Sequence, residues 1–298
     1  MRFAITLFLC FFSLSCSAAN VVTDNLIRPW SKELQKEEPY KYPFVAAYKK
    51  GEFNLRFIAA KHANNINSTT FKIIKKEIKT KPIDLIIIES IPYETGPSPQ
   101  YFLDHAKKCH ETNFSHCSEA AYTIWLNTKK DQSPFVGGEP TDHAILQYMT
   151  KKGFKEHDIA YFYLLRKIPQ LKRQGRLKVN YTEQFKQHIQ RIVRRLSLNE
   201  ELTLSGFLHW YTKHIKKKFL IEDITTHYVA PYNDQKSIFS QKISHAISLY
   251  RDKFIVNLIR KKSKKFKSIL IVYGGSHHTK QKLALEYLFG PTKFRKEL

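Results

Sequence analysis

A strand, a helix and a second strand follow one another within about 40 residues, and this arrangement constrains the fold more than any other feature of the sequence. Residues 53–60, FNLRFIAA, are apolar and predict the first strand. Ser68 can cap a helix that Pro82 ends, and residues 83–90, IDLIIIES, predict the most apolar strand of the chain. Because parallel strands need a crossover connection, the three elements predict a parallel pair with a right-handed crossover.

The rest of the chain adds mainly helical patterns. Its predicted elements are a loop at 91–100, a helical region at 117–129, a short strand at 135–136, a mostly helical insertion at 142–220, a long helix at 236–261, a strand ending before Gly274 and a final helix at 279–289. Together they predict an α/β fold with a helical insertion in the middle of the chain.

The first 19 residues have the composition of an export signal. An apolar run follows Arg2, and Ser17 and Ala19 fit a cleavage site. We predict a signal peptide over 1–19, a single domain over 20–298 and a secreted or periplasmic protein. Lipidation at Cys16 is the alternative for this segment. No later apolar stretch of about 18 residues occurs, so the sequence predicts no transmembrane anchor after signal cleavage.

Two of the four cysteines lie outside the predicted signal peptide. In an oxidising compartment, Cys109 and Cys117 most simply form a disulfide with each other. The alternative is a zinc site that also uses His110 and His116, although zinc-binding cysteines are usually separated by about two to four residues.

The chain is strongly basic. It has 50 Lys and Arg against 26 Asp and Glu, a formal net charge of +24. This excess favours an acidic partner, for example a negatively charged cell surface. Predicted export argues against nucleic acid as the partner. The runs HIKKKF and RKKSKKFK are typical of solvated helix faces, and they lack the interleaved aromatic residues that stack on single-stranded nucleic acid.

Four chemically active side chains come at the end of a predicted strand or at a tight turn. His62 follows the first strand by two residues, and Glu89 closes the second. Glu139 and His277 each follow a pair of glycines. In open α/β sheets the ligand crevice lies outside the carboxyl ends of the strands, so we expect these four side chains to converge there.

Two imidazoles and two carboxylates suffice for hydrolysis by either of two mechanisms. In one, His62, Glu89, Glu139 and His277 hold a divalent ion such as Mn²⁺, Zn²⁺ or Co²⁺, whose bound water attacks an amide or ester. In the other, a histidine takes the proton from water and a glutamate fixes its tautomer. Singly, each residue also has a structural interpretation, as a hydrogen-bonded histidine or a helix cap; their occurrence together favours catalysis.

Arg251 is a fifth candidate catalytic residue, because it lies on the apolar stripe of the long predicted helix. It is four residues from Ile247 and four from Ile255. A cation on that stripe needs an anion, so Arg251 either pairs with Glu89 or Glu139 or binds an anionic group of the substrate. The structural alternative is that its side chain extends along the helix to solvent.

Read together, these motifs resemble the Tiki, TraB and GumN superfamily, which also includes the erythromycin esterases and the haem-binding ChaN lipoproteins. Its hallmarks are two glutamates and two motifs of a small residue followed, three residues later, by His. AAKH, ending at His62, and GGSH, ending at His277, resemble these motifs. IIIES and GGEP supply Glu89 and Glu139 in the positions of the two acids.

The same resemblance covers the long helix, where RDKFIVNLI places Arg251 and Asp252 before the final strand. It implies a mixed, largely parallel central sheet flanked by helices. It also implies an exported hydrolase of amide or ester bonds, with a small-molecule or peptide substrate and with or without a divalent metal ion. One alternative is a haem- or metal-ion-binding exported protein of the ChaN type without hydrolase activity. Another is a basic surface-interaction protein with an inert hydrolase-like scaffold.

Overall fold

The structure of the chain is a computed structural model that describes residues 24–295, except residues 97, 116 and 131. The predicted signal peptide over 1–19 lies outside the described residues. Contacts group the described chain into two compact units. The first consists of 24–28, 32–139 and 252–295, and the second of 29–31 and 140–251. The predicted insertion at 142–220 falls wholly within the second unit.

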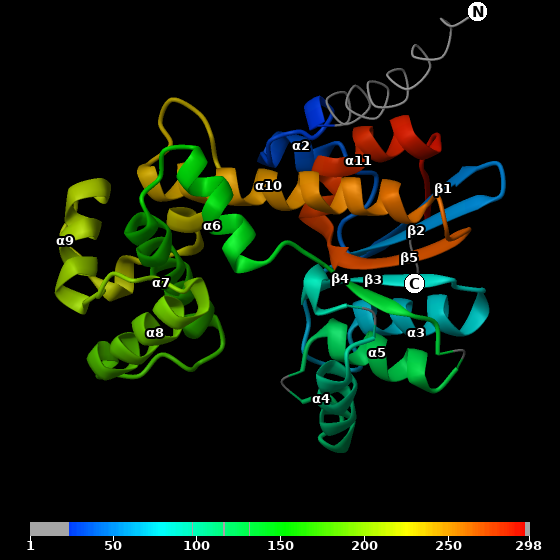
Figure 1. The fold of residues 1–298 in the computed structure, drawn as a ribbon, viewed down its shortest axis with the longest axis horizontal. Coiled ribbons are helices and arrows are strands. Elements are labelled where there is room, and N and C mark those ends of the chain that lie inside the picture. Colours follow the sequence, from blue (N-terminus) through cyan, green and yellow to red (C-terminus); the bar gives the residue numbers. More distant parts are fainter. Residues whose placement is uncertain (1–23, 97, 116, 131, 296–298) are drawn as a thin grey trace, which may run out of the picture. The chain divides into compact units, whose positions relative to one another are not determined.

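A six-stranded mixed sheet forms the centre of the first unit (Figure 1). Its strands are β1 (Phe44–Lys50), β2 (Phe53–Ala60), β3 (Leu85–Pro92), β4 (Phe135–Glu139), β5 (Ser268–Gly274) and β6 (Lys293–Arg295). They lie in the order β4-β3-β5-β2-β1-β6. The strands β4, β3, β5 and β2 run parallel, whereas β1 and β6 pair antiparallel at one edge. This confirms the predicted α/β fold with a mixed, largely parallel sheet.

The β-α-β unit is present, with one difference from the prediction. α3 (Thr69–Thr80) connects β2 to β3, and the Ser68 side chain caps it by accepting a hydrogen bond from the backbone N–H of Phe71. The two strands are parallel, but they do not pair directly as the sequence predicts, because β5 lies between them and pairs with both. A continuous apolar strand such as β5 suits this central position, since helices cover both faces of a parallel sheet.

Helices cover the two faces of the sheet (Figure 1). Ile86 and Leu270 pack with α3 and α5 (Glu119–Thr128) in one hydrophobic core. Because strand side chains alternate, Ile87 and Ile271 face the opposite side, where α11 (Gly275–Phe289) lies. The other α-helices among the described residues of this unit are α2 (Lys32–Lys36), α4 (Gln100–Glu111) and the last part of α10 (Phe239–Lys262).

The start of α11 corrects the predicted boundary of the last helix. α11 begins at Gly275, directly after β5, whereas the sequence pattern predicts a start at 279. His277 therefore lies in the first turn of a helix and not in a tight turn. The glycines are needed because neighbouring side chains approach the backbone closely at this junction. The elements β1, β6 and α4 are absent from the sequence prediction.

The second unit is helical, as predicted for the insertion. It contains α6 (Asp142–Lys151), α7 (Glu156–Arg173), α8 (Tyr181–Leu196), α9 (Leu204–Ile215) and the first part of α10. Its core is rich in aromatic side chains, among them Phe162, Phe185, Phe207 and Tyr211. The indole N–H of Trp210 donates a 2.9 Å hydrogen bond to the buried Asp158, which satisfies both polar groups inside this core.

Cys109, near the end of α4, and Cys117 form a disulfide, as predicted. It joins the end of α4 to the segment that leads into α5. No helix among the described residues combines the length and apolar character that crossing a bilayer requires.

Candidate active site

Three of the predicted site residues reach the same edge of the sheet because their strands are neighbours. β2, β5 and β3 are adjacent and parallel, so their carboxyl ends lie side by side. His62 follows β2 by two residues, and His277 lies in the first turn of α11, directly after β5. Glu89 lies in β3 just after Ile88, the last residue that pairs with β5. Sheet topology therefore unites side chains that are far apart in the sequence.

The two imidazoles both present Nε2 to Glu89. Nε2 of His62 lies 4.0 Å from Oε2 of Glu89, and Nε2 of His277 lies 3.8 Å from Oε1. The backbone N–H of Gly274 donates a 2.7 Å hydrogen bond to Oε2 and fixes the carboxylate. Both Nε2–carboxylate distances are longer than a hydrogen bond, so the imidazoles face Glu89 without bonding to it directly through Nε2.

The other ring nitrogen of each histidine is held by a second carboxylate. Nδ1 of His62 lies 2.5 Å from Oε1 of Glu119, and Nδ1 of His277 lies 2.6 Å from Oδ1 of Asp252. Since an ionised carboxylate only accepts hydrogen bonds, each Nδ1 carries the proton and donates it. In the neutral form of each imidazole, the lone pair is then on the Nε2 atom that faces Glu89.

Asp252 is fully buried within a hydrogen-bonded network. Besides His277, it accepts a 2.7 Å hydrogen bond from Nε2 of Gln281, and its other oxygen pairs with Nζ of the buried Lys280. Burial alone raises the pKa of Asp252, but Lys280 and His277 outweigh burial and lower this pKa to about 2. Asp252 is therefore an anion at neutral pH, and it favours the protonated form of His277.

The two histidines differ in their access to solvent. The side chain of His62 is 66% exposed, whereas that of His277 is 9% exposed. The imidazole of His62 can therefore exchange protons with bulk water, whereas that of His277 is largely shielded from solvent. Such a difference suits two distinct roles in one reaction.

Glu139 lies at the end of β4 and is linked to His277 through Tyr273. The Tyr273 hydroxyl donates a 2.6 Å hydrogen bond to Oε1 of Glu139. The ring of Tyr273 contacts the ring of His277 edge to face, with 4.9 Å between centroids. Glu139 thus fixes the Tyr273 side chain that contacts His277, and its predicted role as a metal ligand or catalytic acid stays a prediction.

His278, the neighbour of His277, has a structural environment. It is fully buried, with Nδ1 3.1 Å from Oε1 of Glu38 and Nε2 2.8 Å from the hydroxyl of Tyr48. Phe44 and Phe57 contact its ring. With both nitrogens in hydrogen bonds, His278 connects α11 to Glu38, just after α2, and to Tyr48 in β1. The paired imidazoles therefore serve different purposes.

The backbone around Glu89 is irregular. The register between β3 and β4 shifts between Ile88 and Pro92, and Ser90 has φ of 69°, a left-handed value that residues other than glycine seldom adopt. Bulges of this kind redirect side chains at the end of a strand. Here the irregularity falls on the residue that follows the central carboxylate of the cluster.

Gly274, the last residue of β5, and Gly275, the first residue of α11, give a paired test of this junction. A Cβ at Gly275 would lie 2.2 Å from the ring of Tyr42, whereas at Gly274 it would lie 3.1 Å from Nε2 of His62 and 3.3 Å from Oε2 of Glu89. Gly275→Ala is expected to destabilise the protein by about 1–3 kcal/mol, because the ring must move. Gly274→Ala is expected to cost less, since only the ends of two side chains must shift. Thermal unfolding checks the order; a larger loss for Gly274→Ala would contradict this geometry.

Several residues of the cluster were not predicted as site residues. Glu119 lies in the first turn of α5, where an acid also suits the helix dipole. Asp252 and Arg251 are neighbours on α10, and the sequence pattern draws attention to Arg251. Arg251 is partly buried and belongs to the second unit, so its predicted pairing with Glu89 or Glu139, or with an anionic group of the substrate, stays a prediction. Asp252 could have been found from the sequence, because an acid three residues before the apolar Ile255 lies on the same, apolar face of the helix.

A comparison of the chain with protein-family models, with curated proteins and with solved structures found no match. The resemblance to the Tiki, TraB and GumN superfamily therefore rests on the motifs quoted above and stays a prediction. The haem-binding alternative of the ChaN type also stays a prediction.

Proposed function

We propose that this protein hydrolyses an amide or ester bond with a water molecule activated by His62, Glu89 and His277. One observation carries the proposal: each imidazole has Nδ1 on a carboxylate and Nε2 within 3.8–4.0 Å of Glu89. The Nε2 lone pairs of the two imidazoles and the anionic carboxylate of Glu89 repel one another unless a proton or a cation lies between them. The cluster therefore favours uptake of positive charge, and removing a proton from water is such an uptake.

His277 is the general base in this proposal. Its Nδ1–H is fixed by Asp252, so Nε2 is the nitrogen that takes the proton from water. The anionic Asp252 then stabilises the imidazolium that forms, as the carboxylate does in hydrolytic triads. Because Asp252 is fully buried, its charge acts on His277 with little screening by solvent.

His62 and Glu89 have complementary roles. Glu89, held by the Gly274 N–H, accepts a hydrogen bond from the water and orients it toward the substrate. His62 is mostly exposed and takes up a proton from solvent at Nε2, so its imidazolium form can protonate the leaving group. Glu119 fixes the His62 ring for this step.

A divalent metal ion fits the chemistry of this donor set. Two imidazoles and one carboxylate are a common ligand set of catalytic zinc, and ligating histidines usually donate Nδ1–H to a carboxylate or carbonyl. Metal–ligand bonds of about 2.0–2.2 Å at tetrahedral angles place nitrogen and oxygen about 3.4 Å apart, so the separations of 4.0 and 3.8 Å would have to shorten when an ion binds. His62, Glu89 and His277 would hold the ion, which would lower the pKa of a bound water.

The cellular setting of the proposal is an oxidising compartment outside the cytosol. The Cys109–Cys117 disulfide supports this, because such bonds persist mainly in secreted and periplasmic proteins. The net charge of +24 supports an acidic partner, for example a negatively charged cell surface.

The test uses the purified chain with two substrate panels, p-nitrophenyl esters of increasing acyl length and a mixed peptide library analysed by mass spectrometry. We expect turnover in at least one panel. Dialysis against EDTA then separates the two forms of the mechanism: turnover lost and restored by Zn²⁺ or Mn²⁺ assigns the metal form, and unchanged turnover assigns the histidine form. A folded protein that cleaves nothing in either panel would contradict the proposal.

A further inference from the structure

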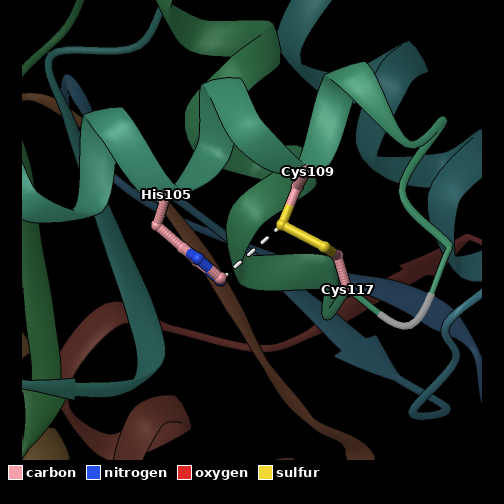
Figure 2. A group of neighbouring side chains, drawn as sticks. All are labelled: His105, Cys109 and Cys117. Carbon is pink, nitrogen blue, oxygen red and sulfur yellow. Dashed lines mark hydrogen bonds between the residues drawn. A yellow bond between two sulfur atoms is a disulfide. The ribbon is translucent and has the colours of Figure 1, made fainter.

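A second group of potential metal ligands consists of His105 and Cys109 on α4 and Cys117 in the segment that leads into α5 (Figure 2). His105 and Cys109 are four residues apart, so they lie one turn apart on the same face of the helix. Nε2 of His105 lies 3.6 Å from Sγ of Cys109, which is bonded to Cys117. Among the residues that the structure describes, these three offer ligand atoms that all lie within 4.8 Å of one another.

The separation of His105 and Cys109 matches a tetrahedral zinc site. Zinc bonds of about 2.0–2.1 Å to nitrogen and about 2.3 Å to sulfur place the two ligand atoms about 3.6 Å apart. His105 and Cys109 have this spacing before any metal binds. While the disulfide is intact the site cannot bind a metal ion through sulfur, because metal ions bind thiolates and not disulfide sulfurs.

We propose that reduction of the Cys109–Cys117 disulfide opens a zinc-binding site formed by His105, Cys109 and Cys117. The reductant is a dithiol. One of its thiolates attacks the sulfur of Cys117, which is the more accessible cysteine, and Cys109 leaves as a thiolate beside His105. The second reductant thiolate then displaces Cys117.

The exchange is balanced in electrons and protons. The dithiol is oxidised to its disulfide, and the protein disulfide takes up two electrons and two protons to give two thiols. Zn²⁺ then displaces both thiol protons and forms two bonds to sulfur and one to Nε2 of His105. Three protein ligands leave a fourth position for water.

The chemistry of these ligands selects the metal. Two thiolates and an imidazole favour Zn²⁺ over Mg²⁺, Ca²⁺ or Mn²⁺, which prefer oxygen ligands. The ligand set differs from the zinc alternative drawn from the sequence, in which His110 and His116 complete the site. The ring of His110 stacks on Trp125, with 4.0 Å between centroids, and His116 lies outside the described residues.

The experiment uses the full chain, reduced with a dithiol, freed of reductant without air and titrated with Co²⁺ in place of Zn²⁺. We expect thiolate-to-cobalt charge-transfer absorption from the reduced protein and none from the oxidised protein. Addition of Zn²⁺ should displace the cobalt and remove this absorption. The signal requires sulfur ligands, so a metal ion at His62, Glu89 and His277 does not contribute, and the result is independent of the proposed hydrolase.

Three variants make the test specific. His105→Ala is expected to weaken Co²⁺ binding by at least about tenfold, whereas His110→Ala, a histidine on the same helix, should bind like the wild type. The double variant Cys109→Ser, Cys117→Ser keeps Cys10 and Cys16 and should give no charge-transfer absorption. Circular dichroism verifies that each variant is folded. Reduced wild type without the absorption, or His105→Ala with wild-type affinity, would overturn the proposal.

Discussion

Replacing His277 with asparagine is expected to lower kcat for hydrolysis by about 10²–10⁴-fold, the usual contribution of a general base. The asparagine amide can still donate to Asp252 from near the position of Nδ1, but it has no nitrogen in place of Nε2. The buried network around Asp252 is kept, so the loss falls on kcat and not on folding. The measurement is steady-state kinetics with the ester or peptide that the wild type cleaves fastest, together with thermal unfolding of the variant.

Two further variants bracket this result. Glu89→Gln removes the central charge of the cluster while keeping its shape, and a comparable loss of kcat is expected. His110→Ala removes an imidazole that stacks on Trp125, and it should leave kcat unchanged. If His277→Asn and Glu89→Gln both retained wild-type turnover, catalysis would not occur at this cluster. An inert basic scaffold would then be the better interpretation of the chain.

The ends of the strands were the part of the site that could be predicted from sequence. His62 and His277 follow apolar strands and Glu89 lies near the end of one, and parallel strands bring such positions to one edge whatever the loops between them. The order of the strands could not be predicted. β5 comes from near the end of the chain and lies between β2 and β3. The local sequence does not indicate which of several buried strands pair, so this order was not predictable.

The supporting carboxylates could not be assigned from sequence for a different reason. An acid in the first turn of a helix, such as Glu119, is expected for the helix dipole alone. Asp252 shares the buried face of α10, which predicts burial of a charge but not the identity of its partners. Those partners, His277 and Lys280, come from α11, whose start was predicted four residues too late. Side-chain networks between helices depend on this register, so an error at the boundary hides them.

The Asp252–Lys280 pair is expected to have the largest effect on stability. Their side chains are 0% and 4% exposed, and Asp252 also holds His277 and Gln281. Removing one charge of a buried pair typically costs about 3–5 kcal/mol, because the remaining charge keeps its desolvation cost and loses its nearest counter-charge. Asp252→Asn and Lys280→Met are each expected to lower the free energy of unfolding by this amount, measured by urea denaturation.

The double variant separates the ion pair from packing. With both charges removed, the desolvation cost of the pair also disappears, so Asp252→Asn, Lys280→Met should be less destabilised than either single variant. The exposed pair of Lys267 and Glu52 is the matched control, and Lys267→Met should change stability little because solvent screens that interaction. Additive losses in the double variant would show that the two buried charges do not depend on each other. The role of Asp252 would then be to position His277, and Lys280 would contribute to stability only through the packing of α11.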